Sequence, residues 1–282
     1  MIAVYVCPKC KFPLEHRSLE SYLCPQCSVE FSVHDKIPFF ITDPPAPDKP
    51  DVRQVYDEIY TNHQDVWVDQ GRSEAFVAFF CELARSLSQG RVLEIGCGEG
   101  SLLAGLTAAE RFGIDPSINA LRRARDRSNA ECAVARSEQL PFPPTFFDLV
   151  VTVGVMEHFE DPDAANREIY RVLTESGHYI ALIQTDLTMP QRLLLKLRQY
   201  IFPRFHPIEL ARWTLKKIRN PIVQPFRKSY TVEGARECIE RSGLKVTDTI
   251  MRTTHPRAPL AGAHVVILIA RKRQETQSID LF

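Results

Sequence analysis

The stretch that decides the fold is Val92-Leu93-Glu94-Ile95-Gly96-Cys97-Gly98-Glu99-Gly100. Its first half is an apolar run with the length of a buried strand, and glycines follow at every second position. Glycines allow a sharp turn and a close approach of the backbone to a ligand, and a helix that follows presents free N–H groups. The spacing is Gly-x-Gly-x-Gly, not the Gly-x-Gly-x-x-Gly of dinucleotide-binding turns. The stretch predicts a ligand-binding turn between a strand and a helix.

Strands and helices alternate on both sides of this turn. Apolar runs predict further strands from Arg111 to Ile114, Phe147 to Val153, His178 to Ile183, Leu244 to Ile250 and His264 to Ala270. Helical spacing predicts helices from Val52 to Tyr60, Ser73 to Leu87, Leu102 to Ala109, Ala120 to Arg127, Ala164 to Leu173 and Val232 to Ser242. The alternation predicts an α/β fold, a mainly parallel sheet with helices on both faces.

Four cysteines near the start form two pairs, Cys7-x2-Cys10 and Cys24-x2-Cys27, with thirteen residues between the pairs. This spacing is typical of a four-cysteine zinc site, and four thiolates suit a closed tetrahedral, structural Zn²⁺. Two redox motifs or two disulfides are the alternatives, but no strand–helix junction of a redox motif is expected here. We predict a small zinc ribbon over residues 1–43, stabilised by its metal.

The bulk composition gives no sign of a membrane span or of a strong charge preference. The chain has 282 residues, with 35 basic and 35 acidic side chains, and 44% of its residues are hydrophobic. No apolar run approaches ~18 residues, and residues 1–6 lack the features of a secretory signal. The expected compartment is the reducing cytoplasm, where thiols stay free or bind metal.

Four prolines within Thr42 to Pro50 predict a stiff linker at 44–51, because proline continues neither a helix nor a central strand. The second domain is then expected over 52–273, followed by a polar tail at 274–282.

Further motifs follow the glycine turn in a fixed order. Asp115 ends the next predicted strand, twenty-one residues after Glu94, where an acid can bind two ribose hydroxyls. Leu140-Pro141-Phe142-Pro143 and Met156-Glu157-His158-Phe159 come next. The series resembles the class I methyltransferases of the small-molecule and quinone type over about residues 55–271. The ribbon resembles the rubredoxin-like ribbons that precede some methyltransferases.

The resemblance implies a Rossmann-like sheet of seven strands, the last one antiparallel, with S-adenosylmethionine over the glycine turn. It implies that Asp115 holds the ribose, that residues near Ser137 flank the adenine and that the end of the strand at Val153 lines the methionine side. The implied cofactor-binding residues are Glu94, Gly96, Cys97, Gly98, Gly100, Asp115, Pro116, Ser137, Glu138, Val153 and Gly154.

The sequence departs from this family at Arg136, where many relatives carry an acid for the adenine amine; Glu138 is the substitute that we expect. The usual Lys-Pro-Gly-Gly turn is also replaced, here by Thr174-Glu175-Ser176-Gly177. A dinucleotide-binding domain and a degenerate fold without catalysis are the alternatives for the whole domain.

His158 is the candidate catalytic residue, because it follows a strand where α/β folds place their sites and because imidazole suits general-base work on a hydroxyl. The alternative is that it packs or caps the next helix. Quinone O-methyltransferases with a similar stretch bind a divalent metal through Glu-x-x-Glu-His, but Gly154 stands at the first position here, so we expect no catalytic metal.

An insertion at about 186–228 is expected to form a helical lid. Within it, residues 191–228 hold ten basic residues and one acid among many apolar ones. A lid over a small hydrophobic acceptor is the favoured interpretation; contact with a membrane surface and contact with RNA are the alternatives. Tyr56, Tyr60 and Trp67 are candidates to close the pocket.

The sequence thus predicts methyl transfer from S-adenosylmethionine to a small organic acceptor, with oxygen favoured. An RNA methyltransferase and a non-catalytic zinc-ribbon adaptor are the alternatives.

Overall fold

The structure is a computed structural model that describes residues 4–43, 50–63, 74–185, 228–253 and 264–273. Within these residues, no helix is both long enough and apolar enough to cross a membrane. Several predicted features fall outside them: Trp67, most of the linker, almost all of the lid and the polar tail.

The N-terminal region forms a small antiparallel sheet of four strands in the order β1-β2-β3-β4. We call residues 4–43 the ribbon. The bounds of its strands are β1 Glu15–Ser18, β2 Ser21–Leu23, β3 Glu30–His34 and β4 Ile37–Pro38. Ahead of these strands, Val6 and Pro13 form an isolated antiparallel bridge.

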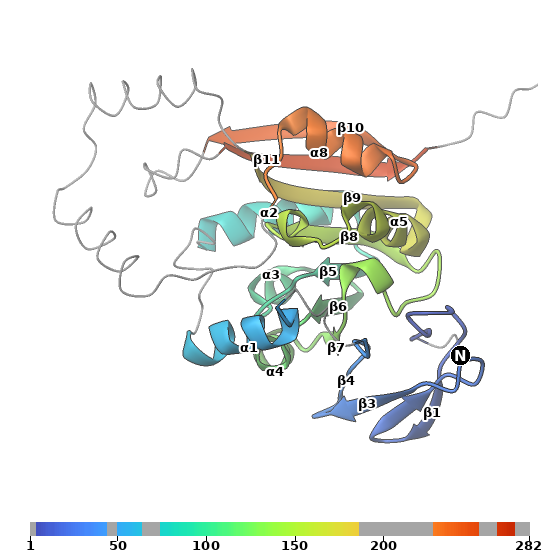
Figure 1. Ribbon diagram of the computed structural model, residues 1–282. Helices are drawn as coiled ribbons and strands as arrows, with labels where there is room; N and C mark the ends of the chain where they lie inside the picture. The colour runs from blue at the N-terminus through green and yellow to red at the C-terminus, as the bar shows by residue number, and fades with distance from the viewer. Residues whose placement is uncertain (1–3, 44–49, 64–73, 186–227, 254–263, 274–282) are drawn as a thin grey trace, which may run out of the picture.

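The main sheet has seven strands in the order β10-β11-β9-β8-β5-β6-β7. Only β11 runs antiparallel to its neighbours, so the predicted Rossmann-like methyltransferase sheet with an antiparallel last strand is confirmed. The strands are β5 Arg91–Ile95, β6 Glu110–Asp115, β7 Glu131–Val134, β8 Phe147–Val153, β9 Leu173–Thr185, β10 Leu244–Thr253 and β11 His264–Lys272. Figure 1 shows them stacked from β10 at the top to β7 at the bottom.

Helices cover both faces of this sheet, as the alternation predicted. Neighbouring residues of β8 lie in different hydrophobic clusters, Val150 in one and Leu149 and Val151 in the other, because successive side chains point to opposite faces. The helices are α1 Val52–Asn62, α2 Glu74–Leu87, α3 Ser101–Gly105, α4 Ile118–Ser128, α5 Pro162–Val172 and α8 Val232–Glu240, with short 3-10 turns η1 Ser137–Gln139 and η2 Met156–His158.

Three local features differ from the prediction. The helix after the glycine turn ends at Gly105 instead of Ala109, because Leu106 is already extended. The four-residue strand β7 was not predicted, since only Val134 among its residues strongly favours a strand. Strand β9 begins directly after α5, so the turn expected at Thr174 to Gly177 belongs to the strand.

The ribbon packs against the edge of the main sheet at β7, as Figure 1 shows at the bottom of the view. Phe39 bridges Val134 in parallel, and the Phe40 N–H donates to the Val134 carbonyl at 2.8 Å. The Tyr5 ring lies 5.0 Å from Phe40 and 5.7 Å from Phe142, between centroids. The ribbon therefore covers an edge strand that would otherwise expose unpaired backbone groups.

A partly buried ionic cluster also joins the ribbon to α5. Lys11 Nζ lies 2.6 Å from the carboxylate of Glu168, which also accepts from Arg171 and from the Leu140 N–H. Burial would raise the pKa of Glu168, but hydrogen bonds and charge from Arg171 and Lys11 hold it below its ordinary value of 4.5. The folded protein therefore favours the ionised carboxylate, and protonation weakens the attachment.

Glu168→Gln is expected to make stability less dependent on acid pH. Because the folded pKa lies below the unfolded one, the contribution of Glu168 is complete at neutral pH and is lost as pH falls through the folded pKa. The variant should be about 2–3 kcal/mol less stable at pH 7, and this difference should narrow in acid. Urea unfolding from pH 7 to pH 3 measures it. Glu175→Gln, at an 80% exposed side chain paired with Lys272, is the control, and a Glu168 deficit that does not change with pH would contradict the assignment.

Candidate functional site

The glycine turn joins the end of β5 to the start of α3 in a conformation that requires glycine. Gly96, Gly98 and Gly100 have φ angles of 67°, 51° and 73°, in the left-handed region. A Cβ at Gly96 would lie 2.5 Å from a methyl of Val155, and one at Gly100 would lie 2.8 Å from the Cα of Ala124. The turn is therefore held close to the segment after β8 and to α4, with its backbone available to a ligand.

Asp115, at the end of β6, ties this turn to the next element. Its carboxylate accepts from the Gly98 N–H at 3.0 Å and from the Ser117 N–H at 3.0 Å, and the residue is only 5% exposed. Ser117 in turn donates to Asp57 of α1 at 2.5 Å. Asp115, which is predicted to bind the ribose, thus lies beside the glycine turn and holds this turn in place. Through Ser117 it is also connected to α1.

Glu94 and Cys97 are buried parts of the predicted set. Glu94 is fully buried in β5, paired in register with Gly113 and Val151. The Cys97 sulfur would lie 2.8 Å from a Cβ at Gly113, and burial raises the pKa of its thiol well above the ordinary range. The Cys97 side chain therefore packs in the core, and only its backbone can face a ligand.

The sequence analysis did not predict the ion pair between Glu99 of the glycine turn and Arg123 of α4, which supports this turn. Glu99 is 4% exposed and accepts from the Arg123 guanidinium of α4 at 2.6 Å. Arg123 also donates to the carbonyl of His63, the C-cap of α1, at 3.1 Å. Charged residues on an exposed helix are common, so the pattern of α4 alone gave no signal for this contact. Arg123 positions the turn relative to both α1 and α4.

Arg123→Met is expected to cost about 3 kcal/mol of stability, because it leaves the Glu99 carboxylate buried without its partner. It should also weaken binding of S-adenosylhomocysteine, because the turn loses its support. Thermal unfolding and calorimetry measure the two effects. Adding Glu99→Gln should restore part of the stability. Arg127→Met, at an exposed α4 residue that donates to Ser101, is the control, and equal behaviour of the two arginine variants would refute the role.

The end of β8 provides open space beside the turn. Gly154 has a φ of 64°, and no atom of the described chain lies within 4 Å of a Cβ built there. Its N–H donates to the Leu182 carbonyl of β9 at 2.8 Å, so the ladder continues to this point. Val153, 4% exposed, ends the strand beneath. The predicted methionine side is therefore a glycine edge with free space in front of it.

The residues predicted near the adenine follow β7. Glu138 accepts from the Ser137 hydroxyl at 2.9 Å and from the backbone N–H of Glu160 at 2.9 Å, so its carboxylate holds the loop before α5. Arg136 pairs with Glu160 at 3.2 Å. Pro116 lines a separate cavity of about 450 Å³ between α1 and the ribbon. The roles of Ser137, Glu138 and Pro116 at the adenine remain predictions.

His158 lies in η2, directly after the carboxyl end of β8, and is half-buried. Its backbone N–H donates to the Val155 carbonyl at 2.8 Å. The neighbouring Glu157 carboxylate accepts from the Gln184 N–H at 2.6 Å, which ties η2 to the end of β9. His158 is thus held on a short turn beside Gly154, and its catalytic role remains a prediction.

The tyrosines of α1 divide into a core residue and a site neighbour. Tyr60 is 2% exposed and packs with Ile59 and Ala120. Burial, and then the charge of Asp115, raise the pKa of Tyr56, which packs against the same cluster. Tyr56 therefore stays protonated near Asp115, whereas Tyr60 is buried in the cluster with Ile59 and Ala120.

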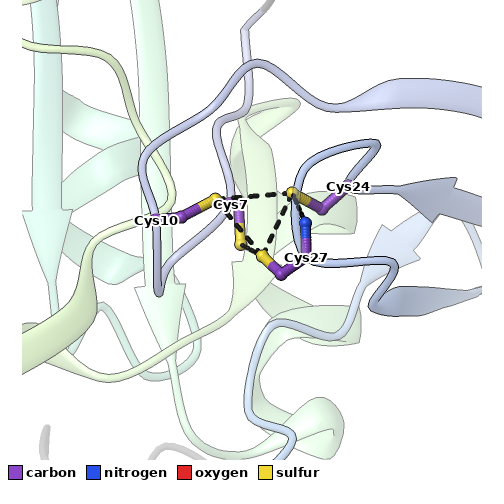
Figure 2. Close-up of side chains that lie close together, drawn as sticks. All are labelled: Cys7, Cys10, Cys24 and Cys27. Atoms are coloured by element: carbon purple, nitrogen blue, oxygen red, sulfur yellow. Dashed lines mark hydrogen bonds between the residues drawn. The ribbon is translucent and has the colours of Figure 1, made fainter.

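The four paired cysteines converge in the ribbon, as Figure 2 shows. All four sulfurs lie within 4.8 Å of one another, and the separations of Cys7–Cys27, Cys10–Cys24, Cys24–Cys27 and Cys10–Cys27 are 3.5, 3.5, 3.3 and 3.2 Å. Four sulfurs bound to one Zn²⁺ at about 2.3 Å in a tetrahedron lie roughly 3.8 Å apart. All eight cysteines of the chain are free thiols in the described residues. The donor set fits a structural zinc ion.

Comparisons with known proteins agree with this geometry. Residues 93–181 match the family model described as Methyltransferase domain. An uncharacterised methyltransferase of Schizosaccharomyces pombe is 32% identical over 113 residues, 34% of this chain and 40% of that protein. The ubiquinone/menaquinone biosynthesis C-methyltransferase of Stenotrophomonas maltophilia is 31% identical over 153 residues, 49% of this chain and 60% of that protein. A solved S-adenosylmethionine-dependent methyltransferase of Thermotoga maritima has the same fold, with a TM-score of 0.52 and 21% identity over 78% of this chain and 99% of that one.

The chain therefore contains a methyltransferase domain with the class I fold. Its fold is that of a solved S-adenosylmethionine-dependent methyltransferase. Because the chain spans 40 and 60% of the two curated relatives, the reaction of the whole protein is treated as a proposal.

Proposed function

We propose that the protein transfers a methyl group from S-adenosylmethionine to a small hydrophobic organic acceptor, with oxygen as the receiving atom. The open glycine edge at Gly154, beside a glycine turn held by Asp115, is the observation that carries this proposal. This edge lies close to the turn, since a Cβ at Gly96 would meet Val155, and the described residues leave space at Gly154 for a ligand. Pockets of this kind lie outside the carboxyl ends of parallel strands.

The residues of the chain divide the work between binding and proton transfer. When bound, S-adenosylmethionine supplies a methyl group on a sulfonium, which is already activated for in-line displacement, so alignment provides much of the rate. Asp115 binds the ribose hydroxyls, and the backbone from Gly96 to Gly100 lies along the ligand. His158 would take the proton that an acceptor hydroxyl gives up as its oxygen bonds to the methyl carbon, while the bond between that carbon and the sulfur breaks and leaves S-adenosylhomocysteine.

The relatives support the acceptor class and suggest a second receiving atom. The similar protein of Stenotrophomonas maltophilia is named for ubiquinone/menaquinone biosynthesis and for C-methylation, and a plant relative is named for a phytyl hydroquinone. Both names describe hydrophobic ring compounds. Carbon is therefore the second candidate for the atom that receives the methyl group, because the relative of Stenotrophomonas maltophilia is named as a C-methyltransferase.

The other proposals concern the ribbon and its surroundings. We propose that Cys7, Cys10, Cys24 and Cys27 bind a structural zinc ion, which fits their sulfur cluster, and that the protein works in the reducing cytoplasm. For the basic insertion, contact with a membrane surface and contact with RNA remain the alternatives to a lid over a small acceptor. The face of the ribbon that includes Lys11 contacts Glu168 of α5, and this contact disfavours RNA binding on the same face.

Transfer of an isotopically labelled methyl group tests the proposed reaction. The purified protein is incubated with labelled S-adenosylmethionine and, separately, with phenolic hydroquinones, their O-blocked analogues and total RNA. Label on the hydroquinone oxygen supports the proposal, and label on ring carbon supports the second candidate. Label only on RNA, with binding that weakens steeply with salt, would overturn the acceptor class. Failure to bind S-adenosylhomocysteine in calorimetry would overturn the enzyme itself.

His158→Ala is expected to lower turnover about a hundredfold without changing the affinity for S-adenosylhomocysteine, since a general base contributes about 10²–10⁴-fold. Single-turnover kinetics and calorimetry separate the two quantities. His178→Ala is the matched control, because His178 lies in the middle of β9, paired with Leu149 near the start of β8, away from the carboxyl end of the sheet. Full turnover of the His158 variant would make that residue structural only.

A further inference from the structure

The last residues of the ribbon, Phe39–Asp43, form a segment that we call the ribbon arm. It leaves β4 and runs parallel to β7, with Phe39 bridging Val134 and the Phe40 N–H donating to the Val134 carbonyl. Val134 is also the last residue of β7, paired with Asp115. Because the arm is parallel to β7, its remaining residues continue past the carboxyl end of the main sheet, where α/β domains bind ligands.

A cavity of about 300 Å³ lies between the arm and the loops that follow β7 and η2. The arm contributes Phe40 through Asp43, and the methyltransferase domain contributes Arg136, Glu138, Gln139, Glu160 and Asp161. Ligand pockets span about 300–1,000 Å³, so this volume suits one end of a ligand rather than a whole molecule. Its wall includes η1, the turn at which the adenine is expected.

Existing contacts fix the charged groups of this cavity. Arg136 is paired with Glu160, and Glu138 accepts from Ser137 and from two backbone N–H groups. Neither side chain is therefore free to turn toward a neutral purine without losing these partners. Thr42 and Asp43, both exposed, and Gln139 bring further polar groups to the wall.

The arm is fastened at both ends of its exposed part. The Ile41 carbonyl accepts from Arg53 of α1 at 3.4 Å. Asp43 pairs at 2.7 Å with Lys9, which lies between Cys7 and Cys10 in the cysteine loop. One exposed ion pair thus connects the cysteine loop to the wall of the cavity, in addition to the chain between Cys27 and Phe39.

We propose that the ribbon arm forms the outer wall of the purine subsite of the cofactor, so that zinc binding in the ribbon sets cofactor affinity. This inference rests on the proposed function, since it presumes that S-adenosylmethionine binds. The arm lies across the cavity from Arg136. At the position of Arg136, many relatives carry an acid that binds the adenine amine. By linkage, cofactor binding also stabilises the arm and the zinc loop that holds it.

The first test fills the cavity from the arm. Thr42→Trp places a large side chain on an exposed residue of the wall and is expected to weaken S-adenosylhomocysteine binding at least tenfold in calorimetry. Gln54→Trp is the control, because Gln54 is exposed on α1 and lines the other cavity, beside Pro116. It should change the affinity less than twofold. Both variants should keep their zinc content and melting temperature. Unchanged affinity in Thr42→Trp, or equal weakening in both, would overturn the proposal.

The second test uses the unmodified protein and does not depend on how a variant folds. Zinc release to a chromogenic chelator is timed with and without saturating S-adenosylhomocysteine. Release at least threefold slower with ligand supports the inference, and an equal rate refutes it. If the wild type binds no S-adenosylhomocysteine, the proposed function fails. If it binds and only Asp115→Ala loses affinity, the role of the arm alone fails.

Discussion

Cys24→Ser is expected to eliminate zinc binding and to unfold the ribbon, the largest effect predicted for any single substitution in this protein. Cys24 is fully buried and lies within 3.5 Å of two other cluster sulfurs. A structural zinc contributes about 10–16 kcal/mol in small zinc peptides, as much as the whole stability of a typical domain. A unit of about forty residues buries too little apolar surface of its own to replace this contribution.

Loss of the ribbon should also affect the methyltransferase domain. Unfolding it uncovers the edge of β7 and the Phe142 ring that packs on Tyr5. We therefore expect a melting temperature lowered by more than about 10 °C and aggregation on heating. Zinc content, circular dichroism and light scattering measure these effects. Cys81→Ser, at a half-buried thiol outside the cluster, is the control. A Cys24 variant with normal melting and no zinc would show that the metal is dispensable.

Asp115→Ala is expected to weaken S-adenosylhomocysteine binding about a thousandfold. The carboxylate holds the glycine turn through Gly98 and the start of α4 through Ser117, and it is the predicted ribose ligand. Hydrogen bonds to a charged group contribute about 1.5–3 kcal/mol each, so loss of two ribose contacts alone accounts for about 3–6 kcal/mol. Calorimetry of the folded variant measures the affinity.

Asp57→Asn provides the matched control for Asp115. Asp57 is a carboxylate in the same neighbourhood, but it accepts from the Ser117 hydroxyl and the Asn119 N–H, not from the glycine turn. Its substitution should lower the affinity less than tenfold. If both variants lose affinity equally, Asp115 acts through the packing of α1 and α4, and the ribose assignment is wrong.

The sequence predicted the parts of the fold that local patterns specify. The buried run of β8 and the glycine turn after β5 are contiguous signals, and the mainly parallel sheet predicted from the alternation of strands and helices is confirmed. The number of seven strands was implied by the family resemblance and is confirmed as well. The cysteine spacing likewise predicted a cluster that the sulfur positions fit. These features depend on residues within one or two elements.

The missed features depend on contacts between distant residues. The Lys11–Glu168 pair spans 157 positions and Arg123–Glu99 spans 24, and neither follows a periodic pattern. Strand β7 is only four residues long, so its pairing with β6 and the ribbon, more than its own pattern, identifies it. Site residues such as Glu138 could be placed near the correct loop from sequence, but their hydrogen-bond partners could not.

The docking of the ribbon on β7 has a consequence for synthesis of the chain. Lys11 leaves the ribosome 157 residues before Glu168, and translation proceeds at about 5–20 residues per second, so the ribbon waits roughly 8–30 seconds for its partner. If the ribbon binds zinc as proposed, it would present Phe40 in a fixed position when Val134 emerges, and the nascent β7 could pair with it at once. Cellular zinc supply during translation would then influence how much of the newly made enzyme reaches its native state.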